Sequence, residues 1–153
     1  MTDLYIRLRR AMTPIAIAIL AACTGVAQAA PYVMFRDPGC GCCTQWADHA
    51  RAGLAHEVTM REDIPMAEIK AKYGVPADLA SCHTSIVEGY VIEGHVPARE
   101  IKRLLRERPA GVKGLAVAGM PLGSPGMEMG GRVQPYQVIA FGEKGRTVYA
   151  RYP

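Results

Sequence analysis

The chain has 153 residues, of which 50% are hydrophobic and 21% are charged, and its formal net charge is +4. This length and composition fit one globular domain preceded by a short targeting segment. So small a positive charge, without aromatic residues interleaved among the basic ones, argues against a nucleic-acid partner.

The N-terminal segment has the pattern of an export signal. The basic stretch MTDLYIRLRR precedes the apolar run AMTPIAIAILAA, which is too short for a membrane span of about 20 residues. The small residues AQA predict that residues 1–29 are a signal peptide and that residues 30–153 are the mature domain. Alternatively, LAAC is a lipoprotein signal that ends before Cys23, which would then carry a lipid. Both routes place the domain outside the cytosol, where disulfides persist.

The mature domain begins with a predicted strand, turn and helix. Residues 32–36 (YVMFR) are apolar and aromatic, as in a strand, and DPG follows as a turn. In CCTQWADHARAGL (42–54) the apolar side chains recur at helical spacing, and we expect Gly53 to end the helix. HEVTMR (56–61) predicts the next strand.

Two further helices are predicted on either side of a hairpin. The segment 64–74 predicts a helix that begins at Pro65 and ends before Gly74. TSIVEGYVIEG (84–94) divides at EG into two short strands. VPAREIKRLLRERP (96–109) predicts an amphipathic helix between two prolines.

The composition changes after this helix. GMPLGSPGMEMGGR (119–132) is rich in Gly, Pro and Met and cannot form a regular element. PYQVIAFG (135–142) and RTVYARY (146–152) then predict a C-terminal β-hairpin. The order β-α-β-α-β-β-α indicates a thioredoxin-like α/β fold, followed by a Gly/Pro/Met-rich loop and the hairpin.

Three cysteines follow the first predicted strand. Cys40 and Cys43 form a C-x-x-C motif where the next helix begins, and the positive end of a helix dipole favours thiolates. Cys42 lies inside this motif. In a thioredoxin-like topology the loop before the third strand passes beside this turn, so we expect Cys82 and His83 to face it. A shared metal ion would require the Cys82 sulfur to lie within roughly 5 Å of the other three.

These side chains form a soft set of donors. Thiolates and the thioethers of Met120 and Met127 favour Cu(I), and Zn(II) is the less favoured alternative. A third thiolate at Cys42 hinders a simple two-thiol cycle but can bridge metal ions. We expect His95 to cap or hydrogen-bond beside the third helix, and Trp46 to pack in the core.

Two other functions stay open from the residues alone. Cys40 and Cys43 could serve a thiol–disulfide oxidoreductase. Alternatively, the cysteines could be disulfides that staple an interaction module.

Three motifs carry a family resemblance. DPGCGCCTQWADH, GVPADLASCHTSIVEGYVIEGHVPAREIKRLL and GLAVAGMPLGSPGME occur in this order and resemble a family of small exported bacterial metal-binding proteins of unknown function, which includes the CopG-type copper-resistance proteins. The resemblance covers residues 32–152. It implies a thioredoxin-like fold, a thiolate-bridged copper cluster, interconversion of Cu(I) and Cu(II), and a role in periplasmic copper tolerance.

We therefore expect a periplasmic copper-binding protein, with lipid anchoring at Cys23 as the alternative, and a copper or thiol oxidoreductase activity stays open. Copper ions are its expected ligand, and a periplasmic copper efflux protein or oxidase is a candidate partner. The expected metal ligands are Cys40, Cys42, Cys43, Cys82, His83, Met120 and Met127.

Overall fold

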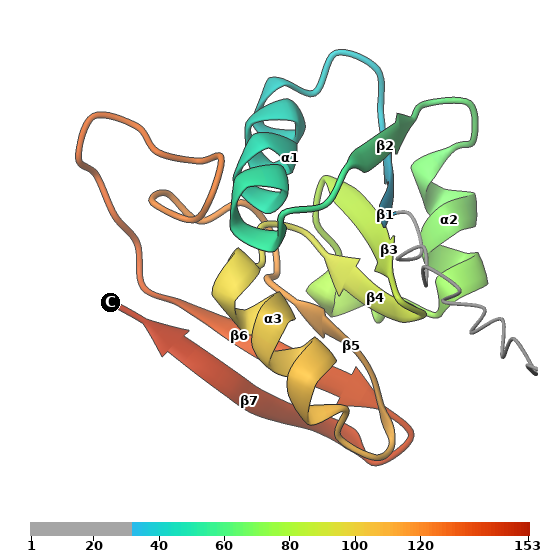
Figure 1. Cartoon of the computed structure of the whole chain (residues 1–153). Helices are drawn as coiled ribbons and strands as arrows, with labels where there is room; N and C mark the ends of the chain where they lie inside the picture. Colours follow the sequence, from blue (N-terminus) through green and yellow to red (C-terminus); the bar gives the residue numbers. More distant parts are fainter. Residues whose placement is uncertain (1–31) are drawn as a thin grey trace, which may run out of the picture.

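The computed structural model describes residues 32–153 (Figure 1). The predicted signal peptide and the lipoprotein signal before Cys23 lie outside these residues. The described part consists of one mixed sheet of seven strands, three α-helices and a short 3-10 helix. None of its helices is both long enough and apolar enough to cross a membrane.

Strands and helices are interspersed from β1 to α3, and the last three elements are strands. The strands are β1 (Tyr32–Arg36), β2 (Val58–Arg61), β3 (His83–Val87), β4 (Tyr90–Glu93), β5 (Val112–Ala116), β6 (Tyr136–Gly142) and β7 (Gly145–Tyr152). The helices are α1 (Gly41–Leu54), α2 (Met66–Tyr73), η1 (Ala77–Leu79) and α3 (Ala98–Glu107). Apart from the short η1, the order from β1 to α3 agrees with the predicted β-α-β-α-β-β-α.

The strands lie in the order β2-β1-β3-β4-β5-β6-β7. β1 is parallel to β2 and antiparallel to β3, and β3 pairs with β4 as an antiparallel hairpin. β4 and β5 are parallel, and β5, β6 and β7 continue the sheet with antiparallel pairs. The start of β3 therefore lies beside the end of β1, where the cysteine turn begins.

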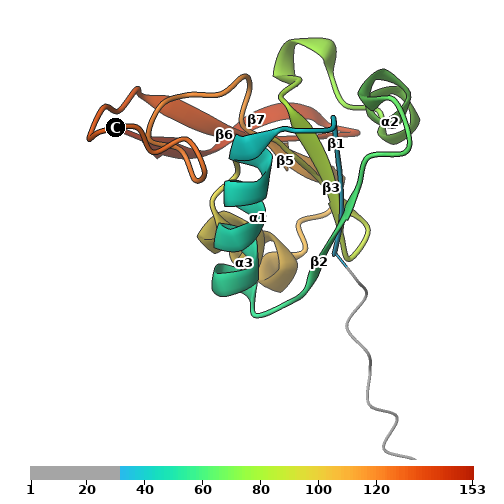
Figure 2. The same ribbon diagram turned by 90° about the horizontal axis from the view of Figure 1, so that it is seen from above.

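Helices cover both faces of the sheet. Side chains alternate along a strand, so Tyr32 and Met34 of β1 pack against the core that α1 and α3 share, whereas Phe35 packs against Met66 and Ile69 of α2. Figure 2 shows α1 and α3 together on one side and α2 on the other. Each large apolar side chain buried in this way contributes about 1.5–3 kcal/mol relative to an exposed one.

One strand was not expected from the sequence. β5 lies between β4 and β6, in a segment to which we assigned no element. Lys113 and Gly114 interrupt its apolar run, so local periodicity does not indicate a strand there, whereas Leu115 and Ala116 are fully buried. Pairing on both sides forms this strand despite the weak local signal.

The end of α1 also differs from the prediction. Gly53 was expected to stop the helix, but α1 continues to Leu54, and Ala55 adopts the left-handed cap with φ 54°. A Cβ at Gly53 would lie 2.4 Å from the Cβ of Ala98. The glycine therefore permits close packing of α1 against α3 rather than ending the helix.

Candidate metal site

The turn from β1 into α1 presents the three neighbouring cysteines. Cys40 is the N-cap residue of α1, Cys42 lies in its first turn, and Cys43 points into the core with no exposed surface. Arg36, at the end of β1, fixes this turn because its guanidinium donates to the Cys40 carbonyl and to the Thr44 hydroxyl, both at 2.7 Å.

Two redox states of cysteine coexist in the cluster. Cys40 and Cys43 are joined by a disulfide, with a Cα–Cα distance of 5.4 Å. Cys42 and Cys82 are free. The C-x-x-C pair is thus in the oxidised form, which cannot ligate a metal as two thiolates until it is reduced.

Cys82 faces this turn from the loop before β3. Its Sγ lies 3.9 Å from the Sγ of Cys42, and the Sγ atoms of Cys40 and Cys42 are 3.5 Å apart. All four site cysteines place their sulfur atoms within 4.8 Å of one another. The expected approach of Cys82 to within roughly 5 Å of the triple is confirmed, although the two segments are about 40 residues apart in sequence.

Two histidines adjoin the Cys82 sulfur. The Nδ1 of His83 lies 3.4 Å from it and the Nε2 of His95 lies 3.1 Å from it. Both rings are fully buried, and they meet edge to face at 5.1 Å. Trp46 closes the other side of His83, with ring centroids 4.5 Å apart, while its indole N–H donates to the Val96 carbonyl.

His95 makes a hydrogen bond, as the sequence analysis expected, but its partner lies outside the third helix. Its Nδ1 donates to the Pro125 carbonyl at 2.8 Å. Its Nε2 therefore carries a lone pair directed towards the sulfur. The hairpin could have indicated this, because the pairing of Val87 with Tyr90, continued along the strands, sets His95 opposite Cys82.

Burial controls the charge of these donors. It lowers the pKa of His83 well below its ordinary value, with a further contribution from His95 and Lys70, and it also lowers the pKa of His95. Burial, reinforced by Cys42, raises the pKa of the Cys82 thiol to about 12. The histidines are therefore neutral, as ligation requires, and a metal ion must displace the proton of Cys82.

A buried carboxylate holds the loop that carries Cys82. Glu93 is fully buried and accepts from the Lys70 ammonium at 2.5 Å, from the Ser81 backbone N–H at 2.6 Å and from the Thr84 hydroxyl at 2.6 Å. Burial raises the pKa of Glu93, and these partners offset part of that rise. Because the N–H it fixes belongs to the residue before Cys82, Glu93 positions the loop rather than the sulfur itself.

The Gly/Pro/Met-rich segment, here called the Met loop (residues 119–132), lies against the site. A Cβ at Gly126 would lie 2.7 Å from the carbonyl oxygen of Cys42 and 2.7 Å from the backbone nitrogen of Trp46. This glycine therefore packs directly on the first turns of α1. Met120 is 52% exposed and Met127 is partly buried.

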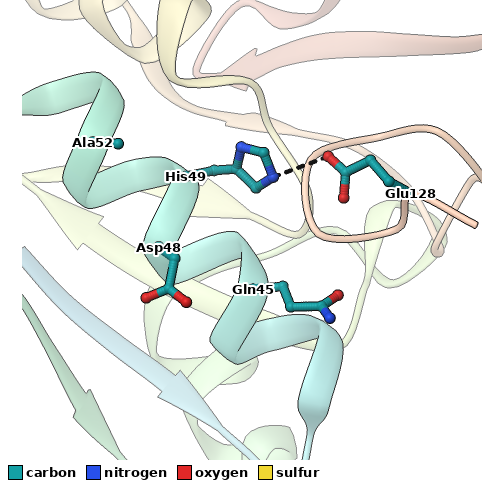
Figure 3. A pocket seen from close by; sticks show the side chains of 5 residues that line it. All are labelled: Gln45, Asp48, His49, Ala52 and Glu128. Carbon is teal, nitrogen blue, oxygen red and sulfur yellow. Dashed lines mark ion pairs between the residues drawn. The ribbon is translucent and has the colours of Figure 1, made fainter.

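A second contact joins the Met loop to the outer face of α1. The Nε2 of His49 pairs with a carboxylate oxygen of Glu128 at 2.9 Å (Figure 3). The other oxygen of Glu128 accepts from the Gly126 backbone N–H at 2.8 Å. Gln45 and Asp48 line the same shallow pocket. The pair is about half exposed, so it contributes little to stability.

Comparisons with known proteins identify the family. The model of the family described as "Protein of unknown function, DUF411" matches residues 79–127, which include Cys82, His83 and His95. No curated protein matches the chain.

Two solved structures are also similar. "Copper resistance protein copG", Form 1, shares 42% identity with a TM-score of 0.75, over 82% of this chain and 98% of that one. Form 2 gives the same identity and TM-score over 80% of this chain and 98% of that one. The chain therefore belongs to the DUF411 family of metal-binding copper-resistance proteins, as its three sequence motifs predicted.

Proposed function

We propose that this protein binds Cu(I) through its cysteine cluster and serves copper tolerance in the periplasm. The observation that carries the proposal is the convergence of four sulfur atoms within 4.8 Å of one another. Sulfur-rich sites select Cu(I) among the biological metals, and Zn(II) is the alternative. The similarity to copG, a copper-resistance protein by its name, supports copper as the cargo.

The sulfur spacing supports a shared ion. With metal–sulfur bonds of about 2.3 Å, two sulfurs on one tetrahedral ion lie about 3.8 Å apart. The two distances that join Cys42 to Cys40 and Cys82 are 3.5 and 3.9 Å. Cys42 is thus the central sulfur of the cluster and the one best placed to bridge two ions.

Binding by all four cysteines requires reduction of the disulfide. A dithiol reductant donates two electrons and two protons to the Cys40–Cys43 bond and is itself oxidised to a disulfide. The two thiols that result lie at the N-terminus of α1, where the helix dipole favours their thiolates. Copper then displaces the remaining thiol protons to solvent. His83 adds an imidazole from the start of β3, and we assign Met120 and Met127 of the Met loop as thioether ligands.

We also propose a thioredoxin-like classification for the first part of the domain. Supporting it are the element order β1 to α3, the sheet order β2-β1-β3-β4, and the C-x-x-C motif in the turn between β1 and α1. A signal peptide at residues 1–29, or lipidation at Cys23, would deliver the domain to the periplasm, where a copper efflux protein or oxidase would be its partner.

A thiol–disulfide oxidoreductase is the second candidate, because Cys40 and Cys43 are disulfide-bonded at a helix N-terminus. In that mechanism a substrate thiolate attacks one sulfur of the disulfide, the other leaves as a thiolate, and a second substrate thiol completes the exchange. This function would need no metal.

The first experiment measures metal content and free thiols together on protein purified anaerobically from copper-supplemented periplasm. Bound copper, with thiols recovered only after its removal, is the expected result. A metal-free protein with a reversible two-electron thiol titration would favour the oxidoreductase instead. A metal-free protein without reactive thiols would favour a disulfide-stapled interaction module.

A substitution then tests the central sulfur. Cys42→Ser should lower the copper stoichiometry while leaving the urea midpoint nearly unchanged, because Cys42 is only partly buried. Ala52→Ser is the control, since it introduces a serine on an exposed position near the other end of the same helix. Unchanged stoichiometry in Cys42→Ser would rule out a cluster bridged by this cysteine.

A further inference from the structure

The two edge strands of the sheet differ in how well they are protected. The strand order places β2 at one edge and β7 at the other, where β7 runs along the outer margin of the domain (Figure 1). β2 has only 4 residues and is followed by Glu62 and Asp63, and a short, charged edge strand resists further pairing. β7 has 8 residues, contains no proline, and carries no charge in residues 147–150. β7 is therefore the edge that is open to another strand.

The outer backbone of β7 is nearly free of partners within residues 32–153. On its inner side the strand pairs with β6. Alternate residues of an antiparallel strand direct their N–H and C=O groups away from the neighbouring strand. Within those residues, one hydrogen bond reaches the β7 backbone from outside this pair, and Arg103 donates it to the Tyr149 carbonyl at 3.4 Å. The other outward groups can pair with an added strand.

Three side chains of β7 lie on one face in the order cation, apolar, cation. Arg146, Val148 and Arg151 are the partners of alternate residues of β6, so they share a face of the sheet. The register shift between Val138 and Ile139 places one extra residue before Arg151 and brings it to this face. A strand that matches this face must itself alternate between charged and apolar side chains.

An apolar groove of about 310 Å³ adjoins the middle of this pattern. Leu79 of η1, Ile139 and Val148 supply its apolar wall, and Arg146 and Thr147 complete the lining. Val148 is 42% exposed, so much of its side chain is available for contact. An apolar side chain of an added strand, placed opposite Val148, would enter the groove and bury apolar surface on both strands.

The charges of β7 decide which strand fits. Its charged residues are Arg146 and Arg151, both positive, and Asp78 offsets Arg146 only through an exposed ion pair. A second copy fits poorly, because antiparallel pairing of residues 147–150 with themselves sets Arg146 of each copy opposite Arg151 of the other. Like charges directly opposite are destabilising. An extended segment with acidic residues at both positions is complementary instead.

We propose that β7 is a docking edge for an extended acidic segment of a partner protein, which joins the sheet beside β7. The backbone of this segment pairs with β7, an apolar side chain enters the groove beside Val148, and carboxylates on either side of it pair with Arg146 and Arg151. Three strands, β4, β5 and β6, separate β7 from β3, at whose start the loop with Cys82 lies. The inference therefore goes beyond the proposed function and does not depend on copper binding.

Binding of a synthetic peptide to the full chain tests this docking edge. The probe is acetylated and amidated, matches β7 in length, and has glutamate and valine in turn at every second position, with threonine between them. The same peptide with lysine in place of glutamate is the control probe. In NMR titration the glutamate peptide should shift the backbone amide signals of β7 and slow their hydrogen exchange, and the lysine peptide should do neither. Shifts elsewhere without slowed exchange in β7 would overturn the proposal.

Substitutions distinguish strand addition from general attraction between charges. Val148→Lys raises the positive charge of β7 but removes the apolar wall of the groove, so it should weaken binding by about tenfold or more. General attraction predicts tighter binding instead. Arg151→Glu should also weaken binding by about tenfold or more. Arg61→Glu, the same reversal on the opposite edge strand β2, is the matched control and should leave the affinity unchanged.

The outcomes that would overturn the docking edge are specific. Tighter binding by Val148→Lys, or equal losses in Arg151→Glu and Arg61→Glu, would each do so. If Val148→Lys fails to fold by circular dichroism, Val148→Thr removes the apolar contact in nearly the same shape and should also weaken binding. A dimer of the free chain in sedimentation, abolished by either substitution of Val148, would show that a second copy occupies β7 and would overturn the acidic partner.

Cu(I) titration of the reduced wild-type chain separates this inference from the proposed function. A chain that binds Cu(I) but not the glutamate peptide would overturn the docking edge alone. A chain that binds the peptide but no Cu(I) would overturn the proposed function and leave the docking edge standing.

Discussion

Replacing Gly126 with alanine should displace the Met loop from the candidate metal site. Gly126 adopts φ 83°, and a Cβ there would come within 2.7 Å of the Cys42 carbonyl oxygen and of the Trp46 nitrogen. Both are backbone atoms of α1, so neither can turn aside as a flexible side chain would. The loop must move, and with it the Pro125 carbonyl that orients His95.

A second glycine of the same loop separates the clash from the backbone strain. Gly130 also has a positive φ, 58°, but a Cβ there meets nothing within 4 Å. Alanine at a positive φ costs about 1–2 kcal/mol, offset by about 0.4–1 kcal/mol of lost freedom in the unfolded chain. Gly130→Ala should therefore destabilise the protein by about 0.5–1.5 kcal/mol, and Gly126→Ala by about 2–4 kcal/mol, because overpacking adds about 1–3 kcal/mol.

Urea denaturation of both variants at one pH, under reducing conditions, measures this difference. The imidazole NMR signals of His95 supply a second readout, since only Gly126→Ala should disturb its hydrogen bond to Pro125. Equal losses of unfolding free energy in the two variants, with unchanged NMR signals of His95 in both, would contradict the packing of Gly126 against α1.

Three further predictions concern buried and exposed charge. Glu93→Gln should lower the free energy of unfolding, measured by urea denaturation, by about 2–4 kcal/mol, because Lys70, only 18% exposed, loses its counter-ion. Adding Lys70→Met should recover part of this loss, and strictly additive losses in the double variant would contradict the ion pair. Burial lowers the pKa of His83 and His95, so the folded metal-free protein binds fewer protons than the unfolded chain below about pH 6.5. Its stability should therefore fall on acidification from pH 7.5 to 5.5, by up to about 1.4 kcal/mol per pH unit for the fully buried His83, and a flat profile of urea midpoints would exclude this. His49→Ala should cost under about 1 kcal/mol, as expected of an exposed pair; a larger loss of unfolding free energy would show that the pair holds the loop.

Local sequence patterns predicted most of the helices and strands. The alternation in β1, the EG turn before β4 and the prolines that begin α2 and α3 are signals that neighbouring residues contain in themselves. β5 lacked such a signal because this strand forms through its pairing with the two neighbouring strands, β4 and β6. The role of Gly53 was misjudged for a similar reason: a helix-ending glycine and a helix-packing glycine look alike until the neighbouring helix is placed.

The site was predictable where topology alone brings residues together. Placing Cys82 and His83 opposite the cysteine turn needed only the element order, whereas His95 needed the hairpin register as well. The spacing of Cys40 and Cys43 could not predict whether they are oxidised or reduced, because a C-x-x-C motif is equally compatible with a disulfide, with two thiolates and with two metal ligands. The Glu93–Lys70 pair joins side chains 23 residues apart on different elements, which no local pattern reveals.

The place of Trp46 gives the molecule its own optical probe. It is the one tryptophan in the chain, it is 2% exposed, and its ring lies 4.5 Å from that of His83. Its emission therefore originates in a dry environment that directly adjoins the side chains proposed to bind metal. Any ion that withdraws electrons from the imidazole, or quenches the excited indole, should be seen as a change in native fluorescence without a label, so that occupancy can be followed on the time scale of mixing.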